Sequence, residues 1–321
     1  MGVSSSGPEQ PVVVSASRRT DIPRFYADWF SARRAAGFAE FANVFGVQGR
    51  VSLAPGDVLG YLFWTRDPEP LRKELRALRQ AHIPYAFQFT ITAYGPDIEQ
   101  CRPPLDHALE QFLEISRALP DPEAIQWRYD PIVLCSRYPA TFHLEAFTRI
   151  AERLAGATRV VNTSLVEPYR KAVQRLADPT VLYRAPDPRR HTSTLKSRPS
   201  LRFAGDQGRK LAADLSVVAR RYGMRLRACA NPELDLPPSQ CCGAELFVPY
   251  GAHVARAVSA LGRAPSRGGC HCLRSVDIGM NETCRGGCQY CYVVRSHRAA
   301  TLNAIEHRPD ASALRPLRGT R

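Results

Sequence analysis

Residues 11–37 read PVVVSASRRTDIPRFYADWFSARRAAG, and this stretch sets the pattern for the whole chain. A short β-branched run leads into polar residues and a proline, which is typical of a buried strand that ends in a loop. The next residues place apolar side chains at helical spacing and stop at Gly37, which predicts a helix closed by a glycine cap. The stretch therefore predicts one strand followed by one helix.

The same unit recurs along the chain. Further apolar runs occupy residues 38–45, 58–68, 85–95, 124–134, 158–169 and 224–233. Helical patterns occupy residues 71–81, 107–119, 142–156 and 208–223. Strands that alternate with helices of this length indicate parallel β/α units. Seven candidate strands favour a β/α barrel, complete or partial, over a doubly wound sheet.

Composition divides the chain into four regions. Residues 1–10 are polar and are predicted to be disordered. The barrel is expected over 11–232, a cysteine-rich extension over 233–294 and a basic, flexible tail over 295–321. Within the barrel, residues 178–210 are rich in proline and basic side chains, which predicts either a lid over an anionic substrate or an unstructured surface excursion.

The net charge of +14 over 321 residues leaves two interpretations open. It favours a nucleic-acid partner, or it reflects a solvated basic surface, because the arginines are spread along the chain. No apolar run is as long as a membrane span, and the first residues do not resemble a signal peptide. We therefore expect no membrane partner and a cytoplasmic location, where clustered cysteines indicate metal more often than disulfides.

Five of the ten cysteines lie within residues 268–295, GGCHCLRSVDIGMNETCRGGCQYCYVVR. The last three, Cys284, Cys288 and Cys291, have the spacing C-x-x-x-C-x-x-C. Three thiolates on so short a loop can hold three irons of a [4Fe-4S] cluster and leave the fourth iron open. The two glycines between the first two cysteines let the backbone curl around a bulky core. Zinc and unrelated structural thiols are the alternatives.

The remaining clustered cysteines predict a second metal site. The ligand set expected is Cys229, Cys242, Cys270 and Cys272, with Cys241 as the alternative to its neighbour, because adjacent residues seldom both bind one ion. An auxiliary iron–sulfur cluster and a zinc ion are both compatible with four thiolates. Simple buried thiols are the third interpretation.

Polar and aromatic residues collect where the predicted strands end, at the face of a β/α barrel that carries chemistry. Arg18, Arg19 and Arg128 are candidates to hold a carboxylate or phosphate, because guanidinium is a planar fork of donors. The same strand ends and the cysteine loop supply further candidates. The acid–base candidates are Asp21, Tyr129, Asp130 and Lys171, and the cofactor-binding candidates are Trp64, Gln88, Thr90 and Tyr290. Asp21 and Asp130 are also suited to neutralising the arginines in a structural network.

The motif CRGGCQYCY resembles the cluster loop of radical S-adenosylmethionine enzymes, and its C-x-x-x-C-x-Y-C-Y form is similar to the spore photoproduct lyase-like branch. The whole chain resembles a bacterial family known as a domain of unknown function. That family pairs SASRRTDIP, here residues 15–23, with DIG and C-x-x-x-C-x-Y-C-Y, here residues 277–292. A Tyr-x-Lys of the family matches Tyr169 and Lys171. In ordinary radical enzymes the cluster loop follows the first barrel strand, whereas here it comes after the body of the chain.

The resemblance implies a β/α barrel, a [4Fe-4S] cluster, S-adenosylmethionine at the open iron and a flavodoxin- or ferredoxin-type electron donor. We therefore expect a radical enzyme that acts on an unidentified anionic substrate at the barrel mouth. One competing hypothesis is a metal-containing nucleic-acid-binding or repair-related protein. Another is an iron–sulfur redox module without catalysis. Arginines that converge on the mouth favour the enzyme, and a continuous basic stripe favours nucleic acid.

Overall fold

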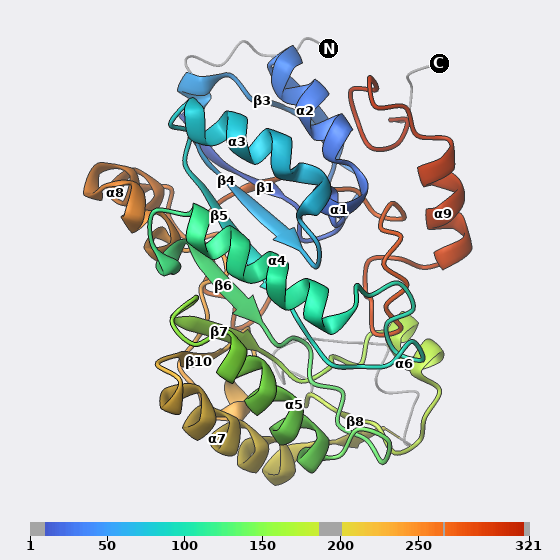
Figure 1. Ribbon diagram of the computed structural model, residues 1–321. Helices are drawn as coiled ribbons and strands as arrows, with labels where there is room; N and C mark the ends of the chain where they lie inside the picture. Colours follow the sequence, from blue (N-terminus) through green and yellow to red (C-terminus); the bar gives the residue numbers. More distant parts are fainter. Residues whose placement is uncertain (1–9, 186–200, 266, 318–321) are drawn as a thin grey trace.

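The main feature of the fold is a seven-stranded sheet in which every paired strand is parallel to its neighbour (Figure 1). The computed structural model describes residues 10–185, 201–265 and 267–317. The strand order is β10-β7-β6-β5-β4-β1-β11. The bounds are β1 Val12–Ala16, β4 Val58–Thr65, β5 Tyr85–Thr90, β6 Ile125–Arg128, β7 Val160–Thr163, β10 Arg225–Ala228 and β11 Val276–Asp277. In the described ranges β10 and β11 are the two edge strands, and β10 is extended only by an isolated bridge between Ala228 and Pro238, which is consistent with a partial β/α barrel.

Helices follow the strands and cover one face of the sheet (Figure 1). They are α1 Ile22–Phe25, α2 Ala27–Ala36, α3 Arg72–Gln80, α4 Leu105–Ala118, α5 Ala140–Arg153 and α7 Gly205–Arg221. The strand residues on this face are large and apolar, and Phe63, Phe87 and Trp127 are fully buried there. The helix α2 ends at Gly37, whose φ of 76° is the left-handed conformation that glycine adopts without strain.

The predicted number of sheet strands is confirmed, but one predicted member is wrong. The run at 38–45 does not join the sheet and forms β2 Phe38–Ala42, which pairs antiparallel with β3 Gln48–Ser52. The seventh strand is instead β11, which pairs with β1. A strand of two residues is too short to show a sequence pattern, so β11 is recognised only from its pairing with β1.

The cysteine-rich extension packs against the other face of the sheet. Alternate strand residues point to opposite faces, so Leu62 and Ala86 turn away from the helices. They pack against Leu246 and Phe247 of the extension, which also carries α8 Ala252–Ala260. Three buried amides continue this face as a hydrogen-bonded ladder formed by Gln88, Gln126 and Asn162. The extension is therefore the inner layer of the fold and not an appended domain.

The end of the chain is more ordered than its composition predicts. Helix α9 His297–Ile305 begins at Ser296, whose hydroxyl accepts a hydrogen bond from Ala299 N. Farther on, Ala311 O accepts a hydrogen bond from Trp29 Nε1 at 2.8 Å, and Leu314 is buried. The tail predicted to be flexible thus packs on α2 in its described part.

Three short elements complete the description. Helix α6 Arg170–Leu176 follows β7, and β8 Leu182–Tyr183 pairs with β9 Arg202–Phe203. Residues 186–200, which are almost half of the predicted lid, lie outside the described residues, as do residues 1–9 of the predicted disordered start. Across the described ranges, every helix is too short or too polar to cross a bilayer.

Candidate metal centre

The two halves of the sequence motif meet at one carboxylate. Asp277 accepts hydrogen bonds from Ser15 Oγ at 2.9 Å, Ser17 Oγ at 2.8 Å, Arg18 N at 2.8 Å and Arg19 Nε at 3.2 Å. Burial acts to raise the pKa of Asp277, but the two guanidiniums and these hydrogen bonds hold it below its ordinary value. The first strand and β11 are thereby held together at the carboxyl edge of the sheet.

The residues after Asp277 lead directly to the cysteine loop. A Cβ at Gly279 would lie 1.8 Å from Ser17 Oγ, so only glycine fits there. Thr283, immediately before the first cysteine of the loop, has its Oγ1 2.6 Å from Thr20 Oγ1, and its carbonyl accepts from Tyr26 Oη at 2.7 Å. The N-terminal motif therefore fixes the start of the cysteine loop, which explains why the two motifs occur together.

The loop then crosses the segment that follows β5. Cys288 forms an antiparallel bridge with Glu99, Gln289 N donates to Ile98 O at 2.9 Å, and Cys101 N donates to Gly286 O at 3.3 Å. Because these partners follow the carboxyl ends of parallel strands, the loop lies at that edge of the sheet. The loop therefore shares this edge with the residues that follow β1.

Helix α6 supports the far side of the loop. Lys171 Nζ donates to Val293 O at 3.1 Å. Arg175 reaches three carbonyls: Nε donates to Gln289 O at 3.0 Å, Nη1 to Val294 O at 2.6 Å, and Nη2 to the carbonyl of Cys291. Lys171 therefore supports the backbone of the loop in this structure.

Gly286 leaves room beside two of the three thiols. A Cβ at Gly286 would lie 3.6 Å from Cys284 Sγ and 3.7 Å from Cys288 Sγ, so the missing side chain leaves room beside both sulfurs. Cys291 Sγ accepts from Val294 N at 3.4 Å. Burial raises the pKa of Cys284 and of Cys288 to about 12, so both keep their protons unless a cation replaces them.

The sulfurs are too far apart for a compact single-ion site. Among the described residues, the group whose ligand atoms all lie within 4.8 Å of one another is Asp67, Glu69 and His107, and no three cysteines meet that limit. Sulfurs around one zinc ion would lie about 3.8 Å apart. The loop cysteines are therefore spread more widely than a ready-made zinc set.

A buried ion pair between Arg66 and Glu99 lies under the loop. No local sequence pattern indicated that Glu99 would lie here. Arg66 donates to both carboxylate oxygens of Glu99, at 2.7 and 2.9 Å, and Glu99 is 1% exposed. Tyr290, between the second and third cysteines, donates its hydroxyl to the same carboxylate. Glu99 is positioned by a loop and not by a motif, so only the tertiary structure places it here.

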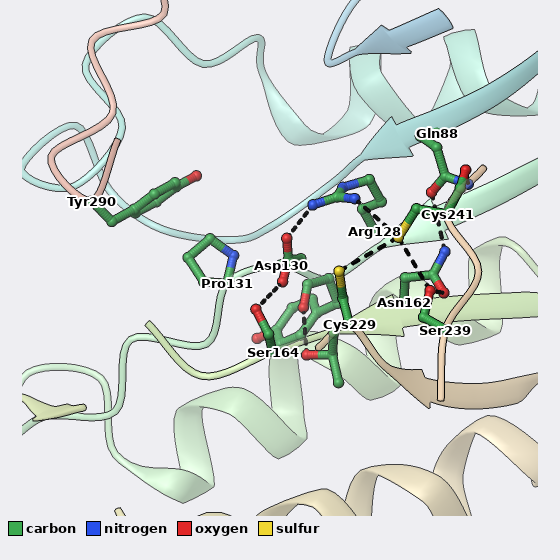
Figure 2. Close-up of polar contacts among 12 residues, drawn as sticks. Gln88, Arg128, Asp130, Pro131, Asn162, Ser164, Cys229, Ser239, Cys241 and Tyr290 are labelled. Atoms are coloured by element: carbon green, nitrogen blue, oxygen red, sulfur yellow. Dashed lines mark hydrogen bonds and ion pairs between the residues drawn. The ribbon is translucent and has the colours of Figure 1, made fainter. Parts of the chain in front are cut away.

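Arg128 lies at the end of β6 on the inner face (Figure 2). Its guanidinium forms an ion pair with Asp130, which also accepts from Ser164 Oγ. It lies over the Trp64 ring, 4.9 Å from the centroid. Trp64 Nε1 is buried and has no hydrogen-bond partner among the described residues, so it is a donor available to a ligand.

Two further side chains, the cationic Arg18 and the aromatic Tyr292, belong to the same site. Arg18 donates to Ser275 Oγ at 3.1 Å, and its side chain remains 22% exposed. Tyr292 stacks on Tyr169 with ring centroids 5.2 Å apart, and its charge environment includes both Arg18 and Arg267. No sequence pattern indicated Arg267 as a site residue, because it lies in a loop between predicted elements.

Several predicted site residues do not face this mouth. Arg19 donates to Ala42 O at 2.8 Å, and the Tyr129 hydroxyl lies 2.9 Å from His143 Nδ1 within the helix-side core. Neighbours in an extended chain alternate between faces, so Arg128 and Tyr129 cannot both point inward. Asp21 caps α1 by accepting from Arg24 N, and burial raises the pKa of Asp21 to about 6.

The remaining predicted residues have structural surroundings. Gln88 is fully buried and donates to Cys241 O at 2.9 Å, and Thr90 ends β5. The second cysteine group lies on the inner face beneath Arg128, where Cys229 and Cys241 have sulfurs 3.5 Å apart (Figure 2). Cys242 is hydrogen-bonded to Ser275. The structure thus brings Cys241, and not Cys242, next to Cys229.

Comparisons with known proteins give one match. No curated protein and no solved structure matches the chain. A family model described as a domain of unknown function, DUF1848, matches residues 13–293, which include the N-terminal motif, the whole parallel sheet except its first residue, and the cysteine loop. The chain therefore belongs to the DUF1848 family.

Proposed function

We propose that the protein is an iron–sulfur enzyme of radical S-adenosylmethionine type that acts on an anionic substrate at the carboxyl edge of its sheet. The observation that carries the proposal is the cysteine loop. Gly286 leaves room beside the sulfurs of Cys284 and Cys288, and Lys171 and Arg175 hold the loop backbone from the far side. A preorganised loop of three thiols is what an open-iron cluster requires.

Iron–sulfur binding fits these cysteines better than zinc does. The sulfurs are more widely spread than in a single-ion site, and a cubane needs such a spread. The loop also supplies three thiols and no fourth, which suits a cluster with one exchangeable iron. The guanidinium of Arg66 lies close enough to Cys288 to oppose its raised pKa, so it favours a thiolate there.

The chain order is compatible with radical chemistry despite the late position of the loop. The loop follows β11, and β11 pairs with β1. It therefore lies beside the residues that follow the first strand, where the N-terminal motif contacts it through Thr20 and Thr283. A loop encoded at one end of the chain thus shares a face with groups encoded at the other.

When bound, the cluster and S-adenosylmethionine would supply an organic radical by one-electron cleavage of the sulfonium, with the electron taken from a flavodoxin- or ferredoxin-type donor. The residues of this chain bind and orient the substrate. Arg18 and Arg128, each paired with an aspartate, would offer their remaining N–H donors to an anionic group, and Trp64 Nε1 supplies a further donor. The apolar inner layer around them excludes water from the reacting centre.

Anaerobic reconstitution with iron and sulfide tests the proposal. The expected result is a brown protein that, when reduced, converts S-adenosylmethionine to 5′-deoxyadenosine. Replacing Cys284, Cys288 and Cys291 together by alanine should abolish colour and turnover. Cys101→Ala is the matched control, because this thiol is exposed and lies outside the set. A colourless protein that holds stoichiometric zinc at the loop, or turnover that survives in the triple variant, would refute the assignment.

A further inference from the structure

The second cysteine group forms a continuous chain of sulfurs on the inner face. Cys241 Sγ donates to Cys229 Sγ at 3.5 Å. Cys241 also lies close enough to Cys272, and Cys272 to Cys270, for each thiol to shift the pKa of its neighbour, although the four come from three separate segments. These segments are the end of β10, the turn before residue 244, and the loop before β11.

This position is an unusual one for four unmodified thiols. Cys241, Cys270 and Cys272 are all less than 9% exposed and lie in the apolar layer between the extension and the sheet. A soft metal ion replaces the protons of such thiols and gives buried sulfur a strong partner in place of a weak one.

Two guanidiniums point at the sulfurs. Arg267 Nη2 donates to Cys229 Sγ at 3.5 Å and to Cys229 O at 3.2 Å. Arg128 Nη1 donates to Cys241 Sγ at 3.7 Å, and Ser239 Oγ lies 3.1 Å from the same sulfur (Figure 2). Hydrogen-bond donors aimed at sulfur are the surroundings of a thiolate ligand, since neutral thiols accept only weakly.

Among the described residues, the ion pairs around the group hold more guanidiniums than carboxylates. The guanidiniums are those of Arg18, Arg128, Arg184 and Arg267, and the carboxylates are those of Asp130, Glu167 and Asp277. A zinc ion or a [4Fe-4S] cluster held by four thiolates carries a net charge of about −2, which such a surplus of positive charge favours.

We infer that these four cysteines form a second thiolate-bound metal centre, separate from the centre on the C-x-x-x-C-x-x-C loop. Among the described residues, no three of their sulfurs lie within 4.8 Å of one another, so the spacing favours an iron–sulfur cluster over a single zinc ion here too. Its ligands are Cys229, Cys241, Cys270 and Cys272, and Cys242 is not among them. The inference goes beyond the proposed function and stands without it, because no residue is shared between the two cysteine groups. The metal secures the inner layer to β10 and so fixes Arg128 at the mouth.

Metal analysis of matched variants tests the inference. The wild type, the Cys284/Cys288/Cys291 triple alanine variant, a Cys241→Ser/Cys272→Ser variant and a Cys242→Ser control are purified anaerobically. Each is then loaded either with zinc alone or with iron and sulfide. The triple variant should retain one centre, seen as about one zinc or about four irons per chain. The Cys241/Cys272 variant should lose that centre and keep the loop cluster, and Cys242→Ser should keep both.

The two loading conditions identify the metal. If zinc alone fills the second centre of the triple variant, the metal is zinc, and if only iron and sulfide fill it, the centre is an iron–sulfur cluster. The inference is overturned if the triple variant holds no metal in either arm, or if Cys242→Ser removes the centre. If the second centre is filled but the wild type holds no cluster at the loop, the result counts against the proposed function and not against this inference. Alkylation of the unaltered protein gives a readout that requires no variant. The metal should protect the four cysteines, and a disulfide or rapid labelling in the loaded protein would also overturn the inference.

Discussion

Asp277 is the residue on which the two ends of the chain depend. It is a mostly buried carboxylate that accepts hydrogen bonds from Ser15, Ser17, Arg18 and Arg19, and water could not replace all four of these donors. Replacing Asp277 by asparagine leaves a similar shape but removes the charge that both guanidiniums require. Breaking such a buried pair costs about 3–5 kcal/mol, so urea denaturation should show a loss of this size.

The pH dependence of the same variant follows from the direction of the pKa shift. The folded-state pKa of Asp277 lies below its ordinary value of 3.8, so its stabilisation is complete above that pH and is lost as pH falls through the folded-state pKa. Asp277→Asn should therefore flatten the acid limb of the stability curve. Asp310→Asn, in an exposed ion pair with Arg308, should change neither quantity noticeably. An unchanged acid limb in Asp277→Asn would contradict the linkage.

Gly286 gives a sharper test at the same scale, because its effect depends on the cluster. An added Cβ would meet the sulfurs of Cys284 and Cys288 at ordinary contact distances, so the metal-free fold should tolerate Gly286→Ala. A cluster needs that space, so the loaded variant should lose iron to a chelator about tenfold faster. Gly56→Ala is the control, since a Cβ there has no neighbour within 4 Å. Equal iron loss in the two variants would show that nothing occupies the space.

At the scale of elements, α6 governs the stability of the cysteine loop. Arg175 donates to three loop carbonyls, and each hydrogen bond from a charged group contributes about 1.5–3 kcal/mol. Arg175→Ala should therefore release the loop without unfolding the sheet. We expect about tenfold weaker iron retention with little change in the main thermal transition. Arg170→Ala, on the exposed start of the same helix, should behave like the wild type.

The elements also show what the sequence could predict. Helices such as α4 and α5 and the glycine end of α2 have periodic patterns, and all were predicted. The hairpin β2–β3 was not, because FAEFA looks locally like any half-buried strand. Cysteine spacing located the candidate loop without a structure. Whether the side chain of Arg128 or that of Tyr129 points to the inner face depends on strand register. The position of Glu99 depends on how the loops fold. Neither could be predicted from the local sequence.

At the scale of the whole molecule, the charge of +14 predicts some affinity for nucleic acid. Several of its arginines are already paired, among them Arg18 and Arg128 at the mouth. We therefore expect only non-specific binding, with a dissociation constant of about 10⁻⁴–10⁻⁶ M at physiological salt that weakens steeply as salt rises. Fluorescence anisotropy with a labelled duplex measures this.

Variants at the mouth separate the two hypotheses. Arg128→Ala should leave nucleic-acid binding unchanged, because the side chain is only 14% exposed. A surface variant such as Arg221→Ala should reduce the salt slope slightly, because Arg221 is exposed at the end of α7. Tight, salt-resistant binding that is lost in Arg128→Ala would favour the nucleic-acid hypothesis over the small-substrate one.

The pairing of β1 with β11 has a consequence for synthesis on the ribosome. Ser15 and its partner Asp277 are 262 positions apart, so the first strand emerges long before its neighbour exists. Throughout that interval the nascent chain carries one open strand edge, which is a template for incorrect pairing. The thiol loop itself is made only when translation is nearly finished. Insertion of the proposed cluster would therefore follow elongation, and a chaperone that shields the open edge would raise the yield of protein able to accept it.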